Sequence, residues 1–164
     1  MRLNHVVLFL CVILFLCGFA SNKEAAEVFG NMAYLVGKPD SAQRVKLVNG
    51  KYEEEFLSVY YENKYVYGDF NHDGLKDAAV IIMENSGGNA DDYELAFLIN
   101  DGKNLVHRAS YYLDVWAIIN SVHVENGKVI VDMYVHQNGD CNAGPSKRVL
   151  NVYAYTRQNI FVSW

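Results

Sequence analysis

The stretch Asp69–Ile82 reads D-F-N-H-D-G-L-K-D-A-A-V-I-I and joins an acidic loop to the start of an apolar run. Oxygen-bearing side chains recur at alternate positions, at Asp69, Asn71 and Asp73, and a glycine follows where a tight turn needs a residue without a side chain. The apolar run Ala78–Met83 is short and β-branched, which is typical of a buried strand. The pattern therefore predicts a loop that leads directly into the buried part of a β-sheet.

The spacing of these oxygens indicates a site for a hard cation. Ca²⁺ binds about six to eight oxygens at about 2.3–2.6 Å, and a loop of this spacing can place them around one point. Water would complete the shell of a site whose predicted ligands are the side chains of Asp69, Asn71, Asp73 and Asp77 and the backbone carbonyl of Leu75. A turn rich in Asp, Asn and Gly, whose side chains cap their own backbone, explains the same residues. Both interpretations stay open at the level of sequence.

The loop matches the opening of an EF-hand but not its end. The twelfth position is Val80, where an EF-hand needs a bidentate Glu, and no amphipathic helix flanks the loop. The form D-x-N-x-D-G-x-x-D running into a strand instead resembles the calcium loops of integrin-type (FG-GAP) β-propeller blades. Those loops take a carboxylate at the ninth position, which is Asp77 here. A propeller repeats its motif in every blade, and this chain has the motif once, so a propeller is excluded.

A longer part of the chain also resembles a known group of proteins. Tyr67–Ala79, the Ser86-Gly87-Gly88 loop and the later segment Gly139–Ser146 are similar to small secreted or lipid-anchored bacterial proteins with a single G-D-x-N-x-D-G-x-x-D-A-A-V motif. The resemblance extends from about Asn49 to about Tyr155. It implies an exported, mostly β domain and carries no enzymatic assignment.

The first twenty residues have the form of a targeting segment. A polar start precedes the apolar run Val6–Cys17, and Gly18-Phe19-Ala20 supplies small residues before a cleavage point. We expect a signal peptide, Met1–Ala20, and an exported protein, either periplasmic or extracellular. A lipoprotein cleaved before Cys17 is the second interpretation, which Leu16 disfavours, and an uncleaved anchor is the third.

The remaining chain, residues 21–164, has the size of one globular domain. The formal net charge of −5 becomes one unit more negative without Arg2, which argues against nucleic acid as a partner. Cys141 is the one cysteine outside the targeting segment, so no internal disulfide is expected. We predict a monomer that binds an unidentified protein or envelope ligand and contacts a membrane only through a lipid anchor at Cys17.

Helix and turn signals predict an α+β fold. Asn22–Leu35 has apolar residues at helical spacing, and Asn49-Gly50, Asp101-Gly102 and Asn126-Gly127 are signals for two-residue type I′ turns between strands. We expect an N-terminal helix packed on a twisted, mostly antiparallel sheet of about eight strands, with partial closure into a barrel as a variant.

Each turn also predicts a strand register. Asn49-Gly50 places Val48 opposite Lys51 and Leu47 opposite Tyr52. The other two turns pair Leu98 with Leu105 and, in the last hairpin, Val124 with Val129 and His123 with Ile130. A single strand is expected over Tyr111–Ser121, with Trp116 and Ile118 facing inward.

Catalytic constellations are weak in this sequence. Of the histidines His107, His123 and His136, the last two are expected on one solvated sheet face, with His123 diagonal to Asp132. Cys141 follows an aspartate that would raise the pKa of its thiol, and no Gly-x-Ser-x-Gly elbow occurs.

The functional expectation is therefore an exported, non-enzymatic envelope or binding domain with one structural Ca²⁺ loop, Asp69–Asp77. The alternative is a hydrolase or an enzyme inhibitor that uses this loop or the Cys141 loop as its working edge. The neighbouring carboxylates Asp91 and Asp92 could bind a second cation, and solvated hairpin chemistry explains them equally well.

Overall fold

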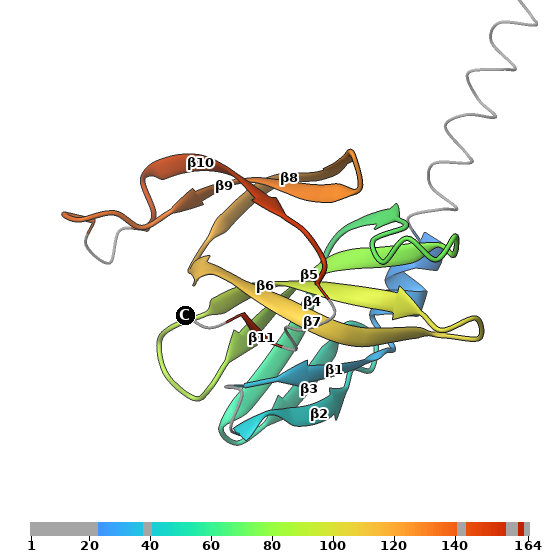
Figure 1. Cartoon of the computed structure of the whole chain (residues 1–164). Coiled ribbons are helices and arrows are strands. Elements are labelled where there is room, and N and C mark those ends of the chain that lie inside the picture. The colour runs from blue at the N-terminus through green and yellow to red at the C-terminus, as the bar shows by residue number, and fades with distance from the viewer. Residues whose placement is uncertain (1–22, 38–40, 141–143, 157–160, 163–164) are drawn as a thin grey trace, which may run out of the picture.

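Strands make up most of the computed structural model, which describes residues 23–37, 41–140, 144–156 and 161–162 (Figure 1). In chain order the strands are β1 (Ala33–Val36), β2 (Gln43–Lys46), β3 (Lys51–Glu54), β4 (Leu57–Gly68), β5 (Asp77–Asn85), β6 (Asp92–Asn100), β7 (Leu105–Val115), β8 (Ile118–Glu125), β9 (Lys128–Val135), β10 (Lys147–Tyr153) and β11 (Phe161–Val162). One helix spans residues 23–29. No helix among the described residues is long and apolar enough to cross a membrane. The predicted signal peptide and Cys17 lie outside the described residues.

The described strands form three separate sheets. The largest has six strands in the order β11-β7-β6-β5-β4-β3, and β8, β9 and β10 form a second sheet with β9 in the centre. The third sheet is the two-stranded ribbon β1-β2. Neighbouring strands are antiparallel except β11, which pairs in parallel with β7. In Figure 1 the three-stranded sheet lies at the top, the ribbon lies at the bottom and the large sheet lies between them.

The large sheet is buried on both faces along β5. Alternate residues Ala78, Val80 and Ile82 pack with the N-terminal helix, β1 and β2 on one face. Ala79 and Ile81 pack on the other face with the apolar side of β9. Because successive side chains of a strand point to opposite faces, an uninterrupted apolar run needs a cover on each side, which the two smaller sheets provide.

The predicted α+β architecture is wrong: the described chain is mostly β, in three separate sheets, and these do not close into a barrel. The predicted helix Asn22–Leu35 is helical only over residues 23–29, and Ala33–Val36 is β1. The helix ends before Gly30, because the Gly30 carbonyl accepts the Gly50 N–H at 2.8 Å instead of continuing the helical hydrogen bonds. A Cβ atom at Gly30 would lie 3.0 Å from the Gly50 nitrogen, so this approach requires glycine. Past that point the chain pairs with β2, which suits the aromatic and β-branched residues of β1.

The turn at Asn126-Gly127 confirms its predicted register. Both residues have positive φ angles, 49° and 72°, as a type I′ turn requires. Val124 pairs with Val129 and His123 pairs with Ile130.

At the other two turns, the predicted register is confirmed only in part at Asn49-Gly50 and is wrong at Asp101-Gly102. Val48 pairs with Lys51 as predicted, but the Leu47 N–H donates to the Met32 carbonyl at 2.9 Å, so this hairpin does not continue. The β6–β7 turn is two residues longer than predicted, and Leu98 pairs with His107 rather than with Leu105. The Asp101 carboxylate accepts the N–H groups of residues 103 and 104, at 3.0 and 2.8 Å, and so stabilises the longer turn.

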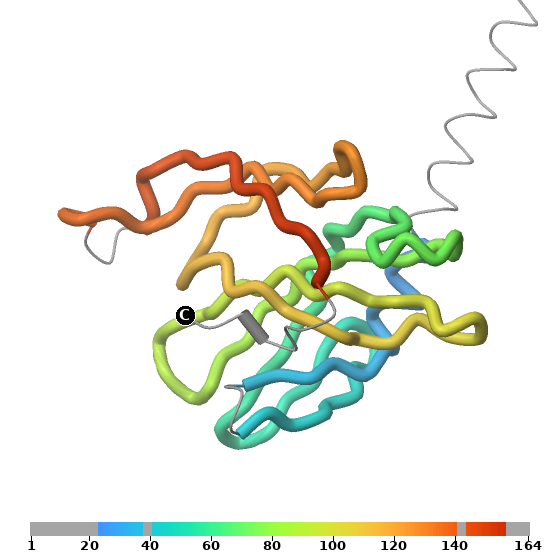
Figure 2. Tube along the Cα trace, viewed as in Figure 1, coloured from blue at the N-terminus to red at the C-terminus, as the bar shows by residue number. Residues whose placement is uncertain are grey.

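The strand predicted over Tyr111–Ser121 is in fact two strands in different sheets. Trp116 has a φ of 49°, and its N–H donates to the Asp91 carbonyl at 2.7 Å. The chain turns there, and Figure 2 follows it from the large sheet to the three-stranded sheet. Ile118 is 52% exposed rather than facing inward.

Candidate functional site

The acidic loop, Asp69–Asp77, joins β4 to β5 at one end of the large sheet. Gly68 pairs with Asp77 across the base of the loop. Phe70 is buried and meets Phe97 edge-to-face, with ring centroids 5.2 Å apart, so the start of the loop is anchored in the core. The turn itself needs left-handed backbone at two positions, His72 with a φ of 61° and Gly74 with a φ of 83°.

Three of the predicted ligands gather in the outer part of this loop. The Asp69 carboxylate accepts the N–H groups of Asp73 and Gly74, at 3.1 and 3.0 Å. The Asn71 side-chain amide donates to Asp73 Oδ2 at 2.7 Å, and Asp73 Oδ1 accepts the Leu75 N–H at 2.8 Å. These contacts place two carboxylates and an amide around one turn. The same contacts supply acceptors for the backbone N–H groups of the turn, as side-chain caps do.

Asp77 lies apart from these three residues and is fully buried. Its Oδ2 accepts the Phe70 N–H and its Oδ1 accepts the Asn100 N–H, both at 2.8 Å. The carboxylate therefore ties the loop to the end of β6. Within the described part of the chain, no group of three or more His, Cys, Asp or Glu residues is arranged to hold a metal ion.

The histidines singled out from the sequence do not converge. His107 is buried; its Nδ1 accepts the Leu35 N–H at 2.8 Å, and burial lowers the pKa of the ring to about 4. His123 is half-exposed, with Nε2 3.3 Å from a carboxylate oxygen of Glu125, but Ile130 and Asp132 on the same face are buried, so the predicted solvated face is solvated only in part. His136 lies beside Asp114 at the end of β9, with 3.5 Å between Nδ1 and Oδ2.

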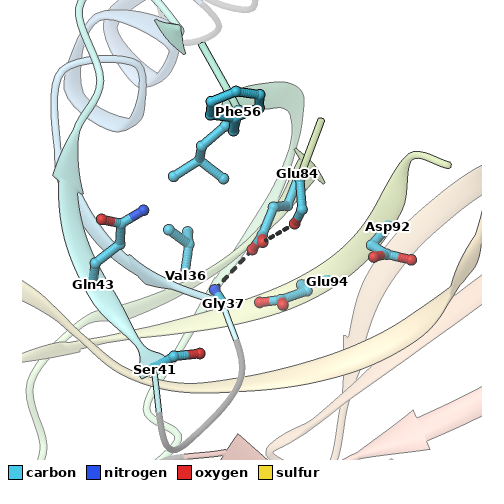
Figure 3. Close-up of a pocket in the computed structure, with 10 residues that line it drawn as sticks. Val36, Gly37, Ser41, Gln43, Phe56, Glu84, Asp92 and Glu94 are labelled. Carbon is cyan, nitrogen blue, oxygen red and sulfur yellow. Dashed lines mark hydrogen bonds between the residues drawn. The ribbon is translucent and has the colours of Figure 1, made fainter. Parts of the chain in front are cut away.

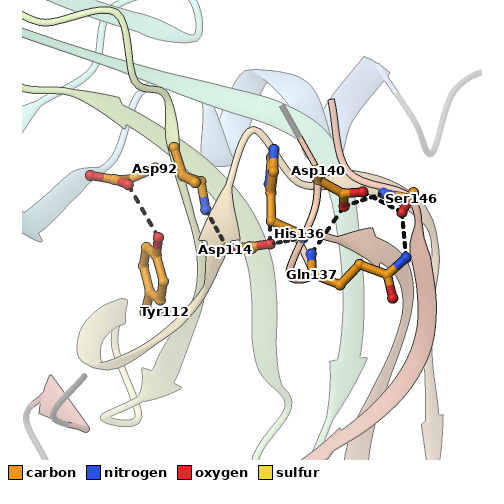
Figure 4. A network of polar contacts seen from close by, with 8 residues as sticks. Asp92, Tyr112, Asp114, His136, Gln137, Asp140 and Ser146 are labelled. Carbon is orange, nitrogen blue, oxygen red and sulfur yellow. Dashed lines mark hydrogen bonds and ion pairs between the residues drawn. The ribbon is translucent and has the colours of Figure 1, made fainter. Parts of the chain in front are cut away.

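The loop that carries Cys141 is fastened by a polar network, although Cys141 itself lies outside the described residues. Asp140 accepts the N–H groups of Gln137 and Ser146, both at 3.0 Å, and the Ser146 hydroxyl at 2.6 Å. The Ser146 hydroxyl lowers the pKa of the Asp140 carboxyl. Figure 4 shows this network next to His136 and Asp114. These hydrogen bonds join the two ends of the loop, so Asp140 and Ser146 have a structural role there.

A second site was missed by the sequence analysis: a cavity of about 690 Å³ between the β1-β2 ribbon and the large sheet (Figure 3). We call it the acidic cavity, and its lining residues are Val36, Gly37, Ser41, Gln43, Phe56, Leu57, Glu84, Ser86, Asp92 and Glu94. It lies at the end of β5 opposite to the acidic loop, because Asp77 begins that strand and Glu84 is near its other end.

The carboxylates of the acidic cavity differ in how they are satisfied. Glu84 accepts the Gly37 N–H and the Ser86 hydroxyl, both at 2.9 Å. Asp92 pairs with Glu84 across the strands, and its carboxylate accepts the Tyr112 hydroxyl at 3.4 Å. Glu94 is 4% exposed and its Oε2 has no hydrogen-bond partner. Burial raises the pKa of Glu94 to about 7, and burial followed by the nearby Glu84 raises the pKa of Asp92.

One signal for this cavity is present in the sequence. Glu94 stands inside the apolar run of β6, and a charged residue within a central strand is rare unless it has a partner or a function. Asp92 shares its face at the two-residue spacing of a strand. The third carboxylate, Glu84, could be added only after the pairing of β5 with β6 and the position of β1 were known.

Comparisons of the chain with protein-family models, with curated proteins and with solved structures yield no match.

Proposed function

We propose that the protein is an exported, non-enzymatic envelope or binding domain in which one Ca²⁺ ion stiffens the acidic loop. Asp69, Asn71 and Asp73 hold the ion through their side chains and Leu75 through its carbonyl, with water in the remaining positions. Asp77, the fifth residue of the predicted set, stabilises the base of the loop by accepting the N–H groups of Phe70 and Asn100.

The observation that carries this proposal is the gathering of Asp69, Asn71 and Asp73 at one turn. Asp73 and Leu75 are exposed, so the turn is open to solvent, and the segment behind it is held by a buried residue, Phe70. The acidic cavity lies at the other end of β5, and none of its lining residues belongs to the acidic loop. That separation supports a structural role for the ion rather than a role in binding a substrate in this cavity.

Export rests on the segment Met1–Ala20, and intact-mass measurement of the native protein tests it. A chain that begins at Ser21 supports cleavage as proposed. A lipid-modified chain that begins at Cys17 replaces it with the lipoprotein interpretation.

Thermal unfolding with Ca²⁺ and with a chelator tests the ion. A ligand that binds only the folded state adds about 2.7 kcal/mol at a hundredfold excess over its dissociation constant, which raises the melting temperature of a domain of this size by several degrees. Metal analysis of the purified protein accompanies the melts, because a tightly held ion survives mild chelation. Equal melting temperatures in a protein shown to be metal-free contradict the proposal.

Asp73→Ala separates an ion site from a turn. It removes a ligand, so the gain from Ca²⁺ disappears, and it also removes a cap worth about 0.5–2 kcal/mol without the ion. The matched control is Asp101→Ala, which removes the same kind of cap from the β6–β7 turn. That variant loses stability but keeps the full gain from Ca²⁺. Equal gains in both variants locate the ion elsewhere.

A further inference from the structure

Glu94 presents an unsatisfied oxygen to the acidic cavity. Its side chain comes from the middle of the large sheet, is 4% exposed and points into the space that lies under the β1-β2 ribbon (Figure 3). The Ser110 hydroxyl hydrogen-bonds the carboxyl, and Oε2 is left without a partner. A buried carboxylate oxygen without a donor costs free energy, so the site favours a ligand that supplies one.

The residues around Glu94 leave its Oε2 oxygen without a hydrogen-bond donor. The Leu35 N–H donates to His107 Nδ1, so the neutral ring carries its proton on Nε2. Nε2 lies 3.0 Å from Ser110 Oγ and 3.1 Å from the Ala109 carbonyl oxygen, so its N–H is shared between these two acceptors and the Ser110 hydroxyl proton is left for Glu94. Glu94 Oε2 receives no donor from these residues.

The charge of the cavity wall points to a cation. Glu84 and Asp92 face each other on β5 and β6, next to Glu94, and none of the described lining residues is Lys, Arg or His. A bare divalent metal fits poorly, because both Glu84 oxygens already accept hydrogen bonds and no metal-holding group of side chains occurs in the described chain. An ammonium or guanidinium group needs acceptors rather than a closed coordination shell.

Part of the cavity wall is apolar. Val36 is buried in β1, Leu57 is half-buried, and Phe56 is 69% exposed at the rim. Phe56 packs against the Ser86-Gly87-Gly88 loop, where a Cβ atom on Gly87 would lie 3.3 Å from the Phe56 Cα. A large exposed aromatic side chain beside buried carboxylates forms a surface for the hydrocarbon part of a charged ligand.

We propose that the acidic cavity binds a small organic cation, whose protonated amine or guanidine lies at Glu94 and whose hydrocarbon part lies against Phe56 and Leu57. The cavity is at the end of β5 that lies away from the acidic loop, so this site is independent of the proposed Ca²⁺ ion.

Isothermal titration of the purified chain at about pH 8 tests the site, because this pH lies above the pKa of Glu94, which burial raises to about 7. The probes are phenethylammonium and its neutral analogue 2-phenylethanol. N-acetyl-lysine methylamide serves as the peptide-borne form of the same charge. We expect phenethylammonium to bind at least about tenfold more tightly than the alcohol, as a charge-assisted hydrogen bond implies. If the lysine derivative binds as tightly as phenethylammonium, the natural ligand of the cavity is a lysine side chain of a peptide. If the lysine derivative does not bind, the natural ligand is a free amine.

Two variants place the binding in the cavity. Glu94→Gln keeps the shape of the side chain and lowers the affinity for phenethylammonium at least about tenfold. Phe56→Ala changes an exposed residue, so the fold is retained, and it weakens phenethylammonium more than methylammonium. The matched control is Glu62→Gln: the pKa of Glu62 is also raised by burial, but its side chain is not among those that line the cavity. This control binds as the wild type does.

Four results overturn the proposal. Equal binding of amine and alcohol shows an apolar cleft without charge recognition, and equal losses in Glu94→Gln and Glu62→Gln show non-specific attraction to an acidic protein. Displacement of phenethylammonium by Ca²⁺ or Mg²⁺, seen as shifts of the same backbone amides by NMR, shows a metal site. No binding of any probe at about 10 mM shows that the cavity does not take cations of this class.

Discussion

The acidic loop and the acidic cavity lie at opposite ends of β5, and their carboxylates differ in burial and in hydrogen bonding. In the loop, Asp69 and Asp73 accept hydrogen bonds from the backbone of their own turn and face solvent. In the cavity, Glu94 is held in the sheet with one oxygen unsatisfied and with the pKa of its carboxyl raised to about 7. Local spacing in the sequence decides the first arrangement, whereas the second exists only after distant strands have come together.

The difference shows what each region contributes to stability. A carboxylate whose acceptors are filled by backbone N–H groups stabilises the fold, because each unmet buried donor would cost about 1–3 kcal/mol. A buried carboxylate with one oxygen left without a donor destabilises the fold and is retained at the expense of stability. Functional sites are often held in this second state. Three substitutions, in Asp77, Glu94 and Gly74, test the contrast, in order of decreasing effect.

Asp77→Ala has the largest expected effect. It leaves the Phe70 and Asn100 N–H groups without acceptors in a buried region, so the free energy of unfolding should fall by about 3 kcal/mol or more. Denaturant unfolding measures this change. Asp77→Asn keeps one acceptor oxygen and should lose about half as much. The loss persists with and without Ca²⁺, and a loss seen only with Ca²⁺ would make Asp77 a metal ligand rather than an anchor.

Glu94→Gln acts in the opposite direction and depends on pH. The pKa of Glu94 is raised from 4.5 to about 7, so the folded state binds more protons than the unfolded state between these values. Wild-type stability therefore falls as pH rises through this window, and the full cost is present above it. The glutamine variant should be more stable by roughly 2 kcal/mol at about pH 8 and should converge with the wild type near pH 4.

His107 adds a contribution of opposite sign in the same range. The pKa of its ring is lowered from 6.5 to about 4, so the unfolded state binds more protons there and stability falls as pH decreases through that window. In the wild type the two slopes partly cancel. Unfolding curves of Glu94→Gln measured across this range should lose more stability on acidification than those of the wild type, because the opposing contribution of Glu94 is gone. Adding His107→Gln to this variant should remove most of that loss, and an unchanged slope would contradict the burial of a neutral His107.

The sequence predicted what depends on neighbouring residues. The buried strand after the acidic loop, the tight turn at Gly74 and the Asn126-Gly127 register were all predicted, because backbone sterics and turn chemistry act over a few residues. The helix end was mispredicted because the Asn49-Gly50 turn, far along the chain, packs against Gly30.

The three-layer architecture and the cavity could not be read in the same way. The apolar run of β5 shows burial on both faces but not which segments cover it. Trp116 starts the crossing from one sheet to another within a continuous apolar pattern, so periodicity alone joins β7 and β8. Glu84 and Glu94 meet only through the β5–β6 register and the position of the β1-β2 ribbon.

Gly74→Ala has the smallest expected effect and separates backbone strain from ion binding. A Cβ atom at Gly74 meets nothing within 4 Å, so the cost comes only from its φ of 83°, about 1–2 kcal/mol, less the entropy that alanine removes from the unfolded chain. Gly102→Ala is the matched control, because Gly102 has a φ of 89° and equally open surroundings in the β6–β7 turn. Without Ca²⁺ the two variants should lose similar stability in thermal or denaturant unfolding. With Ca²⁺ only Gly74→Ala should also lose part of the gain from the ion, because a distorted turn moves the oxygens of Asp73 and Leu75 away from a common point. If both variants keep the full gain, the outer turn of the acidic loop does not hold the ion, and its carboxylates serve the backbone alone.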